Sequence, residues 1–181
     1  MHRKYPSKII ATLLLIFATL IHSPAQAIPS KFALEIGTGL HGLGPYTNIR
    51  INHRLPLMKD RLGVFFGVTP YSGIIAGATG IIGQGVRLGG RYYFTEQGHF
   101  LPYGLVGAGV EFSLSETALP DGSSLPPGFI GSPMLYTGIG FDWFWSKGVG
   151  LNGQIAGGIG GADYFGNNFM VRPEINLKFA F

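Results

Sequence analysis

Histidine and serine are the residue types in this chain that could form a hydrolytic centre. A serine nucleophile needs a base such as histidine within hydrogen-bond reach of its hydroxyl. His41, His53 and His99 lie beyond the N-terminal region, and none of them is followed two positions later by serine. His41 and Ser72 are both expected near one rim of the molecule, but nothing in the sequence indicates that their side chains are adjacent. We therefore expect no catalytic residues, and a hydrolase that depends on His41 stays as the alternative.

Glycine-rich and acidic stretches offer little for cofactor or metal binding. The stretch Gly37-Thr38-Gly39 lacks the strand-to-helix setting that nucleotide-binding loops need. The stretches "GADYFG" and "PDGSS" each contain a single acid, which is too few for a calcium site. The chain has no cysteine, so disulfides and lipid attachment at cysteine are excluded. We expect no cofactor and no metal ion.

Charged residues recur at alternate positions. Successive side chains of a strand point to opposite faces. In the closing stretch "RPEINLKFAF", the charged residues share one face, and Leu177, Phe179 and Phe181 share the other. The same alternation along the chain places both acids and bases on the polar faces, in nearly balanced numbers that allow pairing. We predict that they form a charge network, composed of Glu35, Arg50, Arg54, Arg87, Arg91, Glu111, Asp142, Arg172, Glu174 and Lys178. We expect the four acids to be partners for Arg50, Arg87, Arg91 and Arg172.

The elements that would position these side chains are eight segments of alternating hydrophobicity separated by turn residues, a pattern typical of membrane barrels. They span residues 31–40, 46–55, 62–71, 82–94, 101–112, 133–145, 148–160 and about 169–181. Residues 41–45 are a predicted turn, and 72–81 fit either a strand extension or a glycine-rich loop. Residues 113–132, rich in Pro, Ser and Gly, are the longest expected loop.

The two faces of these segments differ in a way that favours lipid outside and charge inside. No charged residue falls on an oily face, and a lipid-facing Arg or Lys at the bilayer midplane would cost about 2–4 kcal/mol. A soluble β-sandwich or lipocalin-like barrel also alternates, but it needs a more highly charged outer surface. We predict an all-β protein, an eight-stranded antiparallel up-and-down transmembrane β-barrel. Such a barrel is so narrow that side chains fill its interior.

Residues 1–27 have the pattern of a cleaved signal peptide. Arg3, Lys4 and Lys8 precede the apolar run 9–21, and residues 24–27 end in a small-x-small cleavage signal. A short membrane anchor is the alternative, although the run is short for a spanning helix. The rest of the chain, 28–181, is one expected barrel domain. It holds ten of the thirteen basic residues against nine acids, so no nucleic-acid partner is indicated.

The leader, the eight segments, the phrase "RYYF" followed by "LPYGLVGAGVEF", and the ending "INLKFAF" resemble a known group. These are the small eight-stranded outer-membrane barrels of Gram-negative bacteria, including outer-membrane proteins X and W and the transmembrane domain of outer-membrane protein A. The resemblance covers residues 31–181. It implies a bacterial outer-membrane location after cleavage near Ala27, and contact with outer-membrane lipid and lipopolysaccharide. It also implies insertion by the barrel-assembly machinery, which reads a last strand ending in Phe, here with Leu177, Phe179 and Phe181.

The chain departs from particular members of this group. Its charged inner face argues against the apolar channel of the W type. The peptidoglycan-binding domain of the A type has no counterpart after Phe181, and the His-x-Ser of lipid A deacylases has none either. The resemblance implies a structural or surface-interaction role, with outer loops at 72–81, 113–132 and 161–168 available for ligands or partners. A lipid A-modifying enzyme or a narrow channel stays as the alternative, and the oligomeric state is left open.

Overall fold

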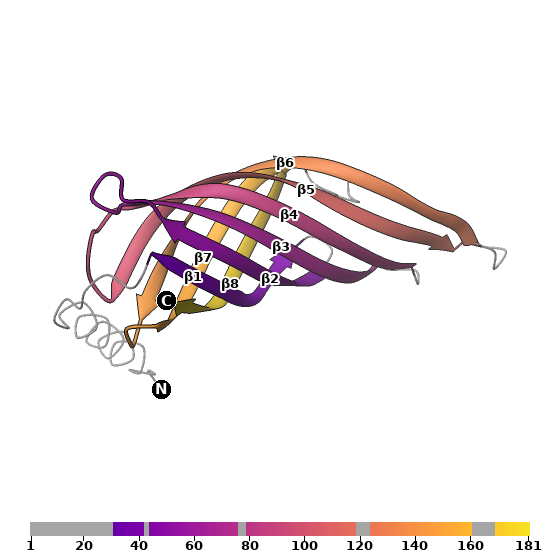
Figure 1. Cartoon of the computed structure of the whole chain (residues 1–181). Helices are drawn as coiled ribbons and strands as arrows, with labels where there is room; N and C mark the ends of the chain where they lie inside the picture. The colour runs from indigo at the N-terminus through magenta and orange to yellow at the C-terminus, as the bar shows by residue number, and fades with distance from the viewer. Residues whose placement is uncertain (1–30, 42–43, 76–78, 119–123, 161–168) are drawn as a thin grey trace, which may run out of the picture.

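The computed structural model describes residues 31–41, 44–75, 79–118, 124–160 and 169–181. Its strands follow one another in chain order, all neighbours are antiparallel, and the first strand pairs with the last to close a barrel (Figure 1). The strands are β1 (Phe32–His41), β2 (Gly44–Arg54), β3 (Leu62–Ile75), β4 (Thr79–Tyr93), β5 (Phe100–Ala118), β6 (Ser124–Phe144), β7 (Val149–Gly160) and β8 (Phe169–Ala180). The predicted fold class, an eight-stranded antiparallel up-and-down barrel, is confirmed. The predicted signal peptide lies outside the described residues.

Backbone pairing decides which side chains share a face. Glu35 of β1 lies opposite Arg50 of β2 on one side and opposite Lys178 of β8 on the other. Gln154 of β7 lies opposite Glu174 of β8. Residues in register on neighbouring strands point the same way, and a closed barrel has no sheet edge. Alternate residues therefore face either an enclosed lumen or the outer wall.

The outer wall is apolar over the length of the barrel, with exposed aliphatic side chains such as Ile36, Leu88 and Ile139. We call the end that holds Lys31, Phe181 and the turns 55–61, 94–99 and 145–148 the terminal end. Aromatic side chains of this wall pack in pairs there, which are Phe32 with His53, Tyr92 with Phe94, and Trp143 with Trp145. An apolar band with aromatic residues at its border is the surface that membrane barrels present to lipid.

No helix among the described residues has the length and apolar character that a membrane crossing requires.

β5 and β6 are the longest strands, and their hairpin extends beyond the other strands at the end opposite the terminal end (Figure 1). The prediction of a long loop over residues 113–132 was therefore wrong. Pro126 and Pro127, which favoured a loop, lie where the register shifts between Ser115 and Thr117. A bulge accommodates proline because its extra residue needs no ladder hydrogen bond. Strand pairing consequently continues on both sides of the two prolines, while the tip, 119–123, lies outside the described residues.

Strand ends account for the remaining differences from the prediction. Residues 72–75 belong to β3 and 79–81 to β4, so a strand extension is the correct alternative there. The turn predicted at 41–45 is shorter, because β1 ends at His41 and β2 begins at Gly44. Each added residue pair satisfies backbone donors and acceptors whatever its side chains are. Backbone pairing can therefore continue past the point where hydrophobic alternation stops. The predicted loop at 161–168 lies outside the described residues.

Gly140 of β6 leaves room for an aromatic ring inside the barrel. A Cβ atom here would lie 2.5 Å from the Tyr103 hydroxyl oxygen and 2.6 Å from the carbonyl oxygen of Gly153. We expect Gly140→Val to lower the free energy of unfolding by about 1–3 kcal/mol, because overpacking must displace Tyr103. Urea unfolding of the folded protein in detergent measures this loss. Gly90→Val is the matched control, since its Cβ would meet only the carbonyl oxygen of Gly63 at 3.7 Å. Equal losses in both variants would contradict the prediction.

Candidate functional site

The structure places the ten charged residues singled out by sequence alternation in the lumen, and all ten are buried. They are Glu35, Arg50, Arg54, Arg87, Arg91, Glu111, Asp142, Arg172, Glu174 and Lys178. All four carboxylates form ion pairs, and five of the six cations take part in them. The sixth cation, Arg54, stands apart from these pairs.

Glu35 is the centre of the network in the half of the lumen near the terminal end. Its carboxylate accepts hydrogen bonds from both terminal nitrogens of Arg91, at 2.7 and 2.9 Å. Lys178 Nζ lies 3.0 Å from the same carboxylate, and Arg50 Nη1 lies 3.2 Å from it. A two-pronged guanidinium contact is the strongest form of such pairing. Three cations thus share one carboxylate, and each of them also contacts another acid.

Glu174 is the centre of the other half. It accepts hydrogen bonds from Arg50, from Arg87 Nη1 at 2.5 Å and from the Tyr46 hydroxyl at 2.5 Å. Gln154 Nε2 donates to it at 2.8 Å and Asn48 Nδ2 at 3.2 Å. Every donor comes from a strand other than β8. This one side chain therefore ties β2, β4 and β7 to the strand that closes the barrel.

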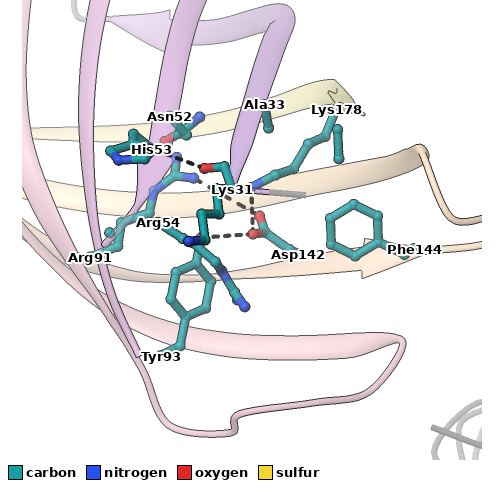
Figure 2. Close-up of a pocket in the computed structure, with 12 residues that line it drawn as sticks. Lys31, Ala33, Asn52, His53, Arg54, Arg91, Tyr93, Asp142, Phe144 and Lys178 are labelled. Carbon is teal, nitrogen blue, oxygen red and sulfur yellow. Dashed lines mark hydrogen bonds and ion pairs between the residues drawn. The ribbon is translucent and has the colours of Figure 1, made fainter. Parts of the chain in front are cut away.

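Two further carboxylates, Asp142 and Glu111, extend the network towards the two ends of the lumen. Asp142 accepts from Lys178 Nζ at 2.6 Å and from the Tyr93 hydroxyl at 2.9 Å (Figure 2). It also accepts from Asn152 Nδ2 at 2.8 Å. At the opposite end, Glu111 Oε1 lies 2.5 Å from Arg172 Nη1 and 3.8 Å from Arg87 Nη2. The ion pairs consequently form one continuous path, running Asp142, Lys178, Glu35, Arg50, Glu174, Arg87, Glu111 and Arg172.

Neutral polar side chains join this path, and sequence reasoning gave them no part in it. They are Tyr46, Asn48, Asn152, Gln154 and Asn176, all buried or nearly so. Gln154, for example, accepts from Arg50 at 2.8 Å and donates to Glu174. The sequence could have identified these residues, because they occupy the same alternate positions as the charged residues. What the sequence lacked was the cross-strand register that brings them together.

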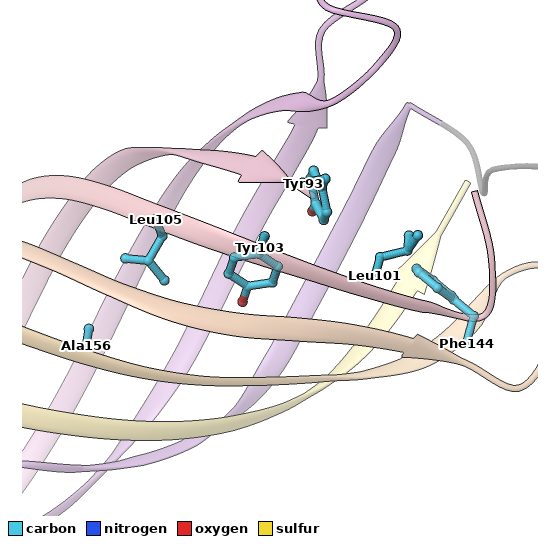
Figure 3. Close-up of a cluster of buried hydrophobic side chains, with 6 residues drawn as sticks. All are labelled: Tyr93, Leu101, Tyr103, Leu105, Phe144 and Ala156. Atoms are coloured by element: carbon cyan, nitrogen blue, oxygen red, sulfur yellow. The ribbon is translucent and has the colours of Figure 1, made fainter. Parts of the chain in front are cut away.

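Aromatic and aliphatic side chains pack beside the charged groups in the lumen. Tyr93, Leu101, Tyr103, Leu105, Phe144 and Ala156 form one buried cluster on the inner faces of β4 to β7 (Figure 3). The Arg91 guanidinium lies 4.6 Å from the centre of the Tyr103 ring. Small cavities of about 20 and 10 Å³ lie on either side of the network. These volumes hold about one water molecule each, as expected for a barrel filled by its own side chains.

One ion pair outside the lumen provides a contrast. Arg61 Nη2 lies 2.8 Å from Glu96 Oε1, and both side chains are one-third exposed. Hydrogen bonds to Tyr92 and to Glu96 raise the pKa of the Arg61 guanidinium. Exposed pairs of this kind contribute little to stability, because water and salt screen them. The pair therefore serves as a control for substitutions inside the barrel.

The other residues of chemical interest lie elsewhere. His53 Nδ1 lies 3.2 Å from the backbone oxygen of Lys31, and His99 Nδ1 lies 2.7 Å from that of Phe144. His41 ends β1, and its side chain is outside the described part of the structure. Where the structure is described, no three His, Cys, Asp or Glu side chains gather into a possible metal site. The predicted insertion residues Leu177, Phe179 and Phe181 lie exposed on the outer wall.

No protein-family model matches this chain, and no curated protein matches it. Several solved structures do match. Neisserial surface protein A has a TM-score of 0.57 at 18% identity, over 88% of this chain and 100% of that one. A major outer membrane protein from Thermus thermophilus has a TM-score of 0.59 at 16% identity, over 83% of this chain and 98% of that one. Ail, the attachment invasion locus protein of Yersinia pestis, has a TM-score of 0.53 at 11% identity, over 84% and 99%. This chain has the fold of small outer-membrane barrels, and the predicted resemblance is confirmed at that level.

Proposed function

We propose that this chain is an integral protein of the bacterial outer membrane, with a structural or surface-interaction role and no catalytic activity. One observation carries the proposal, which is the sidedness of the wall. Aliphatic and aromatic residues cover the outside, while the charged strand residues whose side chains are described lie in the lumen. A soluble barrel gains nothing from that arrangement, whereas lipid requires it. The shared fold with outer-membrane barrels supports the same conclusion.

The proposal includes a route to the membrane. Residues 1–27 would direct export and be removed near Ala27, and Leu177, Phe179 and Phe181 would present the end of β8 to the barrel-assembly machinery. Phe181 donates its backbone N–H to the carbonyl oxygen of Phe32 at 3.0 Å, which extends the seam between β8 and β1. A residue at this seam is well placed to act during closure, because the last strand must pair with the first.

Charge gives a first description of the outer surface. The hairpin extension and the 161–168 segment contain Glu116, Asp121 and Asp163 and no Lys or Arg. The Yersinia pestis protein has also been solved in complex with the heparin analogue sucrose octasulfate. A polyanion of that kind would be repelled by acidic segments. We therefore propose that the outer elements of this chain contact lipopolysaccharide sugars or a neutral or basic partner, and not a sulfated polysaccharide.

Cell fractionation tests the location directly. Expressed with residues 1–27 in a Gram-negative host, the protein should be recovered in the outer-membrane fraction with Ile28 as its first residue. External protease should cut within the β5–β6 hairpin of intact cells while leaving the barrel strands protected. Recovery as a free periplasmic species would contradict the proposal.

The alternative functions, a narrow channel and a lipid A-modifying enzyme, have separate tests. We expect no stable single-channel conductance in planar bilayers, because the charge network and the aromatic cluster fill the lumen. A large porin measured in the same bilayer is the positive control. Mass spectrometry of lipid A from cells with and without the protein should show the same species. Activity that is lost in His41→Ala would instead support the enzyme.

A further inference from the structure

Of the cations in the described part of the lumen, Arg54 alone takes no part in the ion-pair network. Its side chain is only 8% exposed, yet neither terminal nitrogen of its guanidinium has a hydrogen-bond partner among the described residues. No ion pair in the described part of the chain includes it. Its contact is with the face of the Tyr93 ring, 3.8 Å from the ring centre. A buried cation without a counter-charge is costly, and proteins normally pair it.

A second buried residue near Arg54 also lacks hydrogen-bond partners among the described residues. Asn52, on the same face of β2, is 6% exposed, and in the described part of the chain neither its amide nitrogen nor its amide oxygen has a hydrogen-bond partner. Both side chains line the same cavity at the terminal end of the lumen (Figure 2). Its volume is about 20 Å³, which is enough for one object of the size of a water molecule. Two side chains with unsatisfied donors thus line one small cavity.

The charges around this cavity are mostly positive. Lys31, Arg91 and Lys178 line it together with Arg54, and Asp142 is the acid among the lining residues. Asp142 is already bound by Lys178, Tyr93 and Asn152. The lumen carboxylate Glu35 is held by Arg91 and Lys178. No protein carboxylate among the described lumen residues remains to neutralise Arg54.

We propose that a chloride-sized monoanion binds in this cavity, between the guanidinium of Arg54 and the side-chain amide N–H of Asn52. The size of the cavity excludes phosphate and carboxylate ligands, and its donors and excess positive charge disfavour a cation. The Asn52 oxygen is left to accept from a water molecule at the cavity mouth. The site depends only on lumen residues, so its failure and the failure of the membrane proposal are separate outcomes.

Bromide provides a direct probe, because it replaces chloride and scatters anomalously. Crystals of the purified, folded protein grown in bromide should show an anomalous peak beside Arg54. In solution, the unfolding midpoint should rise with chloride or bromide concentration, relative to sodium gluconate at equal ionic strength, since gluconate is too large to enter. Water alone in the cavity at high bromide concentration would overturn the proposal.

Three variants test which residues bind the halide. Arg54→Gln should weaken the apparent halide affinity by about tenfold to a hundredfold, because it removes a charge-assisted hydrogen bond. Asn52→Asp should abolish the halide dependence and raise the midpoint without halide, since its carboxylate can pair with Arg54. Arg61→Gln removes the same charge at the same end of the barrel and should retain the wild-type halide response. An unchanged response in Arg54→Gln or in Asn52→Asp would overturn the assignment.

Discussion

Replacing Glu174 with glutamine is expected to lower the free energy of unfolding by about 3–5 kcal/mol, the loss typical of breaking a buried ion pair. The substitution keeps the shape of the side chain and removes its charge. Arg50 and Arg87 then lose the carboxylate that both of them contact, and each keeps a weaker contact with another acid, Glu35 at 3.2 Å and Glu111 at 3.8 Å. The penalty is large because the two guanidinium groups stay buried.

The measurement is equilibrium unfolding by urea in lipid vesicles, supported by the electrophoretic shift between folded and heated protein. Glu96→Gln is the matched control, since it neutralises a carboxylate whose partner Arg61 is partly exposed. We expect that control to change stability far less than Glu174→Gln does, because an exposed pair is screened by water. A double variant, Glu174→Gln with Arg87→Met, should recover part of the loss, because it removes one of the uncompensated charges. Similar losses for Glu174→Gln and Glu96→Gln would mean that the lumen network does not stabilise the barrel.

Ile36→Arg is the second substitution with a large expected effect. Ile36 lies near the middle of β1, 42% exposed on the outer wall, between Ile49 of β2 and Leu177 of β8. Near the bilayer midplane, an arginine on the lipid face costs about 2–4 kcal/mol. We expect that loss in vesicle unfolding and a lower yield in the outer membrane.

The same substitution separates the membrane barrel from a soluble one. In water, an arginine at an exposed position has little effect and improves solubility. Leu57→Arg is the control, because Leu57 is 54% exposed in the turn after β2 and outside the strands. Little change is expected for it in either case. Unaltered stability of Ile36→Arg in vesicles would contradict the membrane assignment.

Alternation in the sequence was sufficient to identify the barrel because lipid penalises charge so strongly. In the closing strand, Arg172, Glu174 and Lys178 are buried, while Leu177 and Phe179 are exposed on the wall. The other strands also alternate between two different faces, so an error of register in a charged strand would place its charges in lipid. The same penalty does not act on the β5–β6 hairpin beyond the other strands. Its composition therefore indicated a loop, although its backbone continues the ladder.

Individual partners in the lumen depended on cross-strand register and on side-chain length. Glu35 has Arg50 and Lys178 in register on its two neighbours, so these pairs follow from strand pairing. Glu174 and Arg87 lie on strands that are not neighbours, and their contact crosses the lumen. Arg54 lies opposite Gly63 of β3, so register supplies it with no acid. A count of charges on the polar faces shows more bases than acids, but it does not show which base lacks an acid partner.

The sequence by itself determined the architecture and the face on which each strand residue lies, because both follow from a period of two and from the cost of charge in hydrocarbon. Only the tertiary structure decided which carboxylate binds which cation, how far β5 and β6 extend, and that Arg54 and Asn52 line the same cavity. Those features depend on closure of the barrel, which brings strands distant in the chain to within hydrogen-bond reach of one another.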